Sequence, residues 1–148
     1  TKINALVVAL NDLIDDVEVT YKSARSVGYF PRVFGEGVAV TTGTFHLGHM
    51  PQQGCFEKVL VGVDGAGAAD AEFAIKKNGT AITTSNLTLS AGGLYVASTT
   101  FGTGLDDHAE GNLYTVEVVA NGEATPGSSG DGVTGLTIGF VTRLTDTP

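Results

Sequence analysis

The chain has 148 residues, which is enough for one domain with a hydrophobic core and a short extension but excludes a second catalytic domain. Its net charge is −8, and its eight Lys and Arg residues are not clustered, so we expect no nucleic-acid partner. Charged residues make up 16% of the chain, against roughly 25% in ordinary soluble domains, which predicts an uncharged surface suited to contacts with other protein.

The glycines and the cysteine narrow the class further. The 21 glycines lie between strand-like runs without a G-X-Y period, so they indicate tight turns and exclude collagen. The single cysteine, Cys55, cannot form a disulfide within the chain, and the fold therefore does not need an oxidising compartment. No apolar run reaches about 18 residues, and the first residues lack the basic and apolar regions of a signal peptide. We expect cytoplasmic synthesis and no membrane partner.

The first element in chain order is a helix, expected from about Lys2 to Tyr21. Its apolar residues recur at spacings of three and four, as at the a and d positions of helices that pack on other helices: Ile3, Leu6, Leu10, Leu13 and Val17. Further apolar residues at the e positions widen this stripe: Val7, Ile14 and Tyr21. A stripe of this width fits a trimeric bundle, or a helix lying on its own β-domain, better than a parallel dimer. Both arrangements stay open at this point.

The end of this helix is also open. Val17, Val19 and Tyr21 alternate, which is compatible with a helix that ends near Asp16 and a strand that begins there. Acidic residues crowd toward the helix C-terminus, where the helix dipole disfavours them: Asp12, Asp15, Asp16 and Glu18. The isolated helix is therefore expected to be weak and to be held by contacts.

An extended aromatic arm is expected over residues 25–36, between the helical segment 1–24 and a β-domain over 37–148. Gly28, Pro31 and Gly35 disfavour regular structure, but the aromatic residues between them are too apolar for a free tether. We therefore expect the arm to lie on protein, its own or a neighbour's. The predicted protein interface combines the helix stripe and the arm: Ile3, Leu6, Leu10, Leu13, Val17, Tyr29, Phe30, Arg32 and Phe34.

From residue 37 onward the apolar pattern has a period of two, interrupted by Gly, Asn-Gly and Asp-Gly, which is typical of antiparallel strands. Strands are expected over 37–42, 44–47, 55–63, 71–77, 80–84, 87–89, 93–100, 113–120 and 135–144. Asn78-Gly79 is the dipeptide favoured for a type I′ hairpin turn. The pattern predicts a mainly β fold, a jelly-roll-like antiparallel β-sandwich preceded by the short α-helix and the arm. Residues that share one parity within each strand are expected to face the core: Phe56, Val59, Val61, Phe73, Ile75, Val116, Val118, Ile138 and Phe140.

Two groups of residues have the types needed for metal chemistry, and each has a simpler interpretation. His46 and His49, with Cys55 nearby, have the residue types of a zinc site, but a third and a fourth ligand at a proper spacing are missing. Asp106, Asp107, His108 and Glu110 fall in an expected loop and do not match the twelve-residue calcium loop, so we expect a solvated loop.

Motifs for catalysis or cofactor binding are also missing. The Asp64-Gly-Ala-Gly67 segment lacks the Lys of a phosphate-binding loop and is expected to be a turn. No Gly-x-Ser-x-Gly elbow or supported Cys-His pair is present. We predict no catalytic residues, no cofactor and no metal, so the protein is not expected to be an enzyme.

The order of elements resembles small virion proteins of tailed bacteriophages. The resemblance rests on the helix, the arm GYFPRVF (residues 28–34) and a Gly/Thr-rich β-domain containing FAIKKNGTAI (73–82) and GLTIGFV (135–141). The chain is similar to capsid decoration, or cement, proteins and to the jelly-roll head domains of phage fibres. This resemblance implies synthesis in the host cytoplasm and a place on the capsid surface of the virion. It also implies a homotrimer that clamps neighbouring subunits of the major capsid protein.

The alternative within this resemblance is a fibre tip that binds a receptor or a carbohydrate. Sugar sites usually present aromatic platforms, and the chain has no Trp and only four Tyr. Composition therefore favours decoration over sugar binding.

Overall fold

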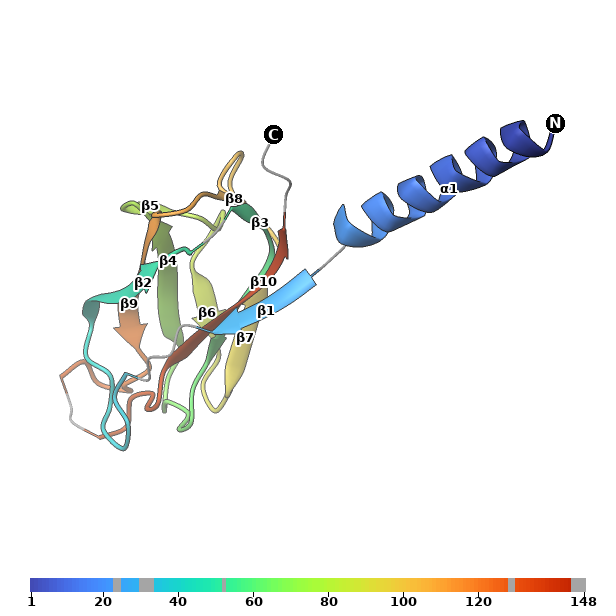
Figure 1. Ribbon diagram of the computed structural model, residues 1–148. Helices are drawn as coiled ribbons and strands as arrows, with labels where there is room; N and C mark the ends of the chain where they lie inside the picture. Colours follow the sequence, from blue (N-terminus) through green and yellow to red (C-terminus); the bar gives the residue numbers. More distant parts are fainter. Residues whose placement is uncertain (23–24, 30–33, 52, 128–129, 145–148) are drawn as a thin grey trace.

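A computed structural model describes residues 1–22, 25–29, 34–51, 53–127 and 130–144 (Figure 1). The described residues form one helix and ten strands. Helix α1 spans Lys2–Lys22. The strands are β1 (Arg25–Tyr29), β2 (Gly43–His49), β3 (Gly54–Gly62), β4 (Ala71–Lys77), β5 (Thr80–Ala81), β6 (Leu87–Leu89), β7 (Tyr95–Ser98), β8 (Asp107–His108), β9 (Leu113–Asn121) and β10 (Thr137–Leu144).

The strands form two antiparallel sheets. In the first sheet the order is β1-β10-β3-β7, and β8 also pairs with β3. In the second sheet the order is β2-β9-β4-β5, and β6 also pairs with β4. Strands β7 and β8 contact different parts of β3, at residues 59–62 and 54–55, so they follow each other along one edge. Strands β5 and β6 share an edge of β4 in the same way.

The pairing of the strands is nested. The first strand pairs with the last, β2 pairs with β9, β3 pairs with β7 and β8, and β4 pairs with the β5 and β6 that follow it. A long antiparallel hairpin wrapped on itself gives this order, which is that of a double-sheet jelly roll. The predicted jelly-roll-like antiparallel β-sandwich is confirmed.

All nine residues predicted to face the core are buried between the sheets. Phe56 is three residues from Val59, so strict alternation would place the two on opposite faces. A bulge places both inward, because Lys58 pairs with Val141 while Phe56 pairs with Thr142 on the next step of β10. The Phe56 ring contacts the rings of four other residues, with centroid separations between 4.6 and 6.1 Å: Phe101, His108, Tyr114 and Phe140.

The strand expected over residues 37–42 is wrong. Gly35 and Gly37 adopt φ values of 66° and 68°, which reverse the chain, and the Val38 N–H donates to the Gly35 carbonyl at 3.2 Å. Val40 is still buried, and its N–H donates to the Val133 carbonyl at 2.8 Å. The alternation of Val38 and Val40 therefore comes from a turn that inserts one apolar side chain into the core.

The Asn78-Gly79 turn is confirmed. Both residues have positive φ, 50° and 88°, as a type I′ turn requires, and Lys77 pairs with Thr80 across it. The Asn78 side chain also accepts a hydrogen bond from the Leu113 N–H at 2.9 Å. The turn is thereby tied to the start of β9.

Helix α1 runs through Asp16 to Lys22, so the alternative helix end near Asp16 is wrong. Thr1 caps the first turn, because its hydroxyl accepts a hydrogen bond from the Asn4 N–H at 3.3 Å. Figure 1 shows α1 extending away from the sandwich rather than lying on it. No helix in the described part of the chain is both long and apolar enough to cross a membrane.

Part of the expected arm belongs to the first sheet. Strand β1 pairs with β10 from Arg25↔Arg143 to Tyr29↔Gly139. The division into 1–24, 25–36 and 37–148 stays a prediction, but a truncation meant to isolate the sandwich should keep residues 25–29, because they complete one edge of the sheet.

We expect Phe56→Ala to lower the free energy of unfolding by about 3–5 kcal/mol, because it empties the centre of the aromatic cluster. Val119→Ala is the control, since Val119 lies on β9 with 45% of its surface exposed and should change stability by about 0.5 kcal/mol or less. Urea unfolding followed by circular dichroism measures both. Equal losses would show that the cluster does not hold the sandwich together.

Candidate interaction surface

The apolar stripe of α1 is exposed. Its six large apolar residues up to position 14 keep half or more of their surface open to solvent: Ile3 73%, Leu6 69%, Val7 50%, Leu10 53%, Leu13 59% and Ile14 53%. The packing of this helix on its own β-domain, which the sequence left open, is therefore excluded over residues 2–14. The backbone of Val17 lies within α1, but its side chain is not among those described.

The exposed stripe is large enough to be a candidate interaction surface. Burying one Leu, Ile or Val side chain contributes about 1.5–3 kcal/mol, so six of them represent on the order of 10 kcal/mol for each chain. The helix has 21 residues and is about 31 Å long, and most helices of this kind depend on packing of the apolar face for their stability. Contiguous exposed apolar surface marks an interaction site.

The two halves of α1 differ in composition. Over residues 3–10, the tip of the helix, the side chains opposite the stripe are also apolar except for Asn4, and Val8 is 59% exposed. Over residues 11–22, the base of the helix, the opposite side carries Asn and acidic residues. A helix that is apolar on all sides is buried on all sides, whereas an amphipathic one is buried along a single face. The tip therefore has more surface to bury than the stripe alone.

The structure describes only some of the arm residues that were predicted for the interface. Phe34 is half-buried, its ring lies 5.1 Å from that of Phe45, and its backbone pairs with Leu136 at 3.0 and 2.8 Å, so it contacts its own sandwich. Tyr29 lies on β1 by its backbone, and its side chain is not among those described. Phe30 and Arg32 lie outside the described residues. An interface role for the arm stays a prediction.

The three residues considered as zinc ligands do not lie together. His46 and His49 lie on β2 in the second sheet, whereas Cys55 lies on β3 in the first. Within the described ranges, Cys55 instead lies beside Asp106 and Asp107, with ligand atoms within 4.8 Å of one another. These are two carboxylates and one thiol at a partly open surface, a group that also occurs without an ion. We assign no metal to it.

The expected solvated loop over residues 106–110 is only partly solvated. Asp107 and His108 form β8, which pairs with β3, and His108 is buried with its ring 4.7 Å from that of Phe56. Glu110 remains exposed. The sequence missed the burial of His108 because a two-residue strand has no periodicity to detect.

Cys55 lies in an environment that favours the neutral thiol. Its Sγ donates a hydrogen bond to the Asp107 carboxylate at 3.4 Å, and the Lys77 ammonium donates to the Asp107 carbonyl at 2.6 Å. Burial raises the pKa of Cys55 above its ordinary value of 9.0, and Asp107 raises it further, while Arg143 acts in the opposite direction. The thiol is therefore a poor nucleophile near neutral pH.

An open pocket of about 370 Å³ lies next to Cys55 at this end of the sandwich. Most of the residues that line it have polar side chains, although their apolar atoms contribute more of the lining surface: Gln53, Gly54, Lys77, Asp107, His108, Ala109 and Asn112. Typical ligand pockets are mostly apolar and bury their ligand deeply. This pocket suits a small polar group held at the surface.

Comparison with protein-family models gives no match, and comparison with curated proteins gives none either. Among solved structures, the chain is similar to the coat protein dimer of tobacco streak virus, with 10% identity over 84% of this chain and 89% of that chain. The TM-score is 0.34, which is too low to support an argument. The fold assignment therefore rests on the strand pairing itself.

We expect Cys55 to react slowly with iodoacetamide at pH 8, because a raised pKa leaves little thiolate at that pH. Asp107→Asn should lower the pKa of Cys55 and accelerate the reaction. Glu110→Gln is the control, because it makes the same charge change in the same loop and should leave the reaction rate unchanged. The measurement is the alkylation rate between pH 7 and 10. Equal rates in the two variants would contradict the assigned role of Asp107.

Proposed function

We propose that this chain is a structural, non-enzymatic protein of a virus particle, specifically a decoration protein that trimerises through α1 on the capsid of a tailed bacteriophage and contacts its major capsid protein. The observation that carries the proposal is the exposed apolar stripe of α1 next to a sandwich that completes its own core. Jelly rolls of this kind occur in viral capsid proteins and lectins, so the fold is compatible with a virion protein.

A trimer follows from the width of the stripe. Apolar residues at a, d and e cover more of the helix than a two-stranded seam buries, and closed symmetry makes three such helices parallel. Parallel packing brings together the C-terminal halves of the three helices (residues 11–22), which carry the acidic residues. However, only Asp16 flanks the seam. The other three acidic residues lie at outward positions: Asp12, Asp15 and Glu18. Salt and distance weaken repulsion between such exposed charges.

The apolar tip of α1 supports attachment to a capsid. In a bundle that buries the stripe, Val8 still lies on the outside of the helix, one heptad before Asp15. The outer surface of the bundle is therefore largely apolar at the tip, where Asn4 is the polar exception, and richer in acidic residues at the base, which suits insertion of the tip into another protein. A protein that binds the assembled shell and not its dispersed subunits stabilises the shell by mass action.

The second candidate is a fibre or receptor-binding tip, favoured by the polar pocket near Cys55. Lys77, Asp107 and Asn112 offer hydrogen-bond donors and acceptors of the kind a carbohydrate requires. The copy number in the purified particle separates the two candidates: hundreds of copies indicate decoration, and a handful indicate a fibre.

We expect Leu10→Asp to convert the trimer into monomers and to reduce the helical signal, because it places a charge in the apolar seam. Asn11→Asp introduces the same residue one position later, on the outward side, and should leave the trimer intact. Light scattering after gel filtration and far-UV circular dichroism measure the two effects. The same mass for both variants would contradict assembly through the stripe.

We expect Val8→Asp to leave the trimer intact but to weaken binding to particles stripped of this protein by about tenfold or more, because it charges the apolar tip. Asp15→Asn is the control at the equivalent heptad position and should bind normally. Co-sedimentation with stripped particles measures binding, and heat-induced DNA release measures capsid stability. Normal binding by Val8→Asp would contradict anchoring by the tip; unchanged DNA release with slower adsorption to cells would favour the fibre candidate.

A further inference from the structure

The outer face of the first sheet carries an uncharged patch. Val59, Val61 and Ile138 point into the core, so the residues that alternate with them on β3 and β10 point outward. Cross-strand pairing brings outward residues of three neighbouring strands together, since Gly62 pairs with Tyr95 and Leu60 pairs with both Ala97 and Gly139. We call this group the uncharged patch: Leu60, Gly62, Tyr95, Ala97, Thr137 and Gly139.

Tyr95 is the most prominent residue of the patch. It is 73% exposed, and its cross-strand partner is a glycine, so its ring has no side chain opposite it on β3. Leu94, the residue before it, is 55% exposed. Tyrosine is enriched among the residues that dominate binding energy at protein interfaces, because it buries a large rigid surface at a low entropic cost.

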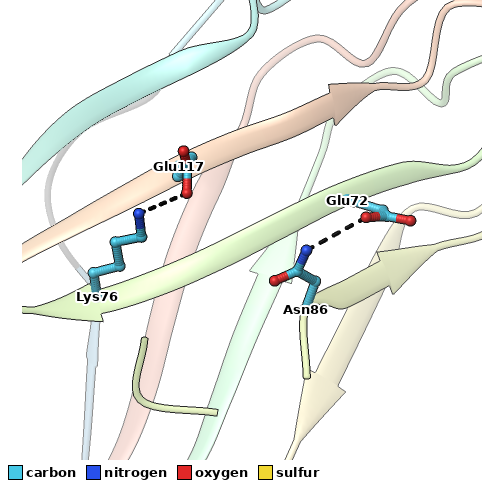
Figure 2. A network of polar contacts seen from close by, with 4 residues as sticks. All are labelled: Glu72, Lys76, Asn86 and Glu117. Carbon is cyan, nitrogen blue, oxygen red and sulfur yellow. Dashed lines mark hydrogen bonds and ion pairs between the residues drawn. The ribbon is translucent and has the colours of Figure 1, made fainter. Parts of the chain in front are cut away.

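The outer face of the second sheet has the opposite character. Lys76 on β4 forms an ion pair with Glu117 on β9 at 2.7 Å, and Asn86 donates a hydrogen bond to Glu72 on β4 at 3.4 Å (Figure 2). These residues satisfy each other while remaining accessible to water. The two broad faces of one sandwich therefore differ: the second sheet carries a charged network suited to solvent, and the first carries the uncharged patch, with the exposed Lys58 beside it on β3.

The chain path places α1 next to the first sheet. Only residues 23–24 separate the end of α1 from β1, and β1 is the edge strand of that sheet. A bundle of three α1 helices would hold three first sheets close to its axis. Tethers this short give effective concentrations on the order of millimolar, so a contact patch well below the roughly 800 Å² per partner of a standard interface suffices to join the domains.

We propose that the uncharged patch of each sandwich packs against a second copy of this chain, so that the first sheets face inward in the assembly and the second sheets face solvent. This inference rests on the proposed self-association through α1. Each copy carries a net charge of −8, so copies held together by their helices repel each other, and a contact surface without acidic groups adds least to this repulsion. The patch is such a surface, whereas the face that carries Glu72 and Glu117 is not.

The test is thiol labelling of the full chain. In a Cys55→Ser background, Ala97→Cys places a thiol on the patch, and Thr88→Cys places one on the outer face of the second sheet, where Thr88 is also exposed. Labelling by a maleimide is compared in the assembled protein and in the same variants carrying Leu10→Asp. Because Leu10 is exposed on α1, this change leaves the core of the sandwich intact.

We expect the Ala97→Cys thiol to be labelled about tenfold or more slowly in the assembly than in the Leu10→Asp background, since interfaces exclude solvent from their centres. The Thr88→Cys thiol should react at the same rate in both. If light scattering shows a trimer but the Ala97→Cys thiol reacts as fast as the Thr88→Cys thiol, the inference fails while assembly through α1 stands. A monomeric full chain overturns both.

Discussion

The apolar stripe of α1 cannot be buried within one copy of the chain, and this constraint determines how the rest of the molecule is interpreted. The sandwich fills its own core, with Tyr114, Phe73 and Ile75 fully buried between the sheets, so it offers the helix no interior to enter. We propose association with other protein as the way in which these six large side chains are removed from water. In such an assembly one outer face of each sandwich can contact other copies while the opposite face contacts solvent, which accounts for the difference between the two faces.

Much of the fold could be predicted from the sequence because local signals and tertiary contacts agree. The strands over 71–77 and 87–89 have the predicted bounds, since each is a short alternating run bordered by turn residues. The errors arise where a local exception changes the meaning of the pattern. Positive φ values at Gly35 and Gly37 convert an alternating run into a turn, and a bulge near Glu57 lets Phe56 and Val59 share one face. Neither depends on the hydrophobic pattern, so alternation alone could not show them.

The candidate interaction surface could also be predicted only in part from the sequence. The stripe of α1 was evident from its heptad spacing, but whether it faced its own domain or solvent depended on tertiary structure. The sequence predicts an arm where β1 lies, because Gly28 and Pro31 interrupt the pattern and the partner strand β10 lies more than a hundred residues away. The uncharged patch was not predicted either. It exists only because pairing brings Tyr95, Leu60 and Gly139 from three strands onto one face, and sequence proximity does not indicate such a row.

We propose that the stripe of α1 holds copies of this chain together. Sedimentation equilibrium of the full chain tests it most directly, because it gives the mass in solution without assuming a shape. We expect three times the 15.1 kDa of one chain at micromolar concentration, with the mass falling on dilution together with the helical signal. A mass of 15.1 kDa with the helix fully formed would contradict it, because the exposed stripe would then be stable without a partner.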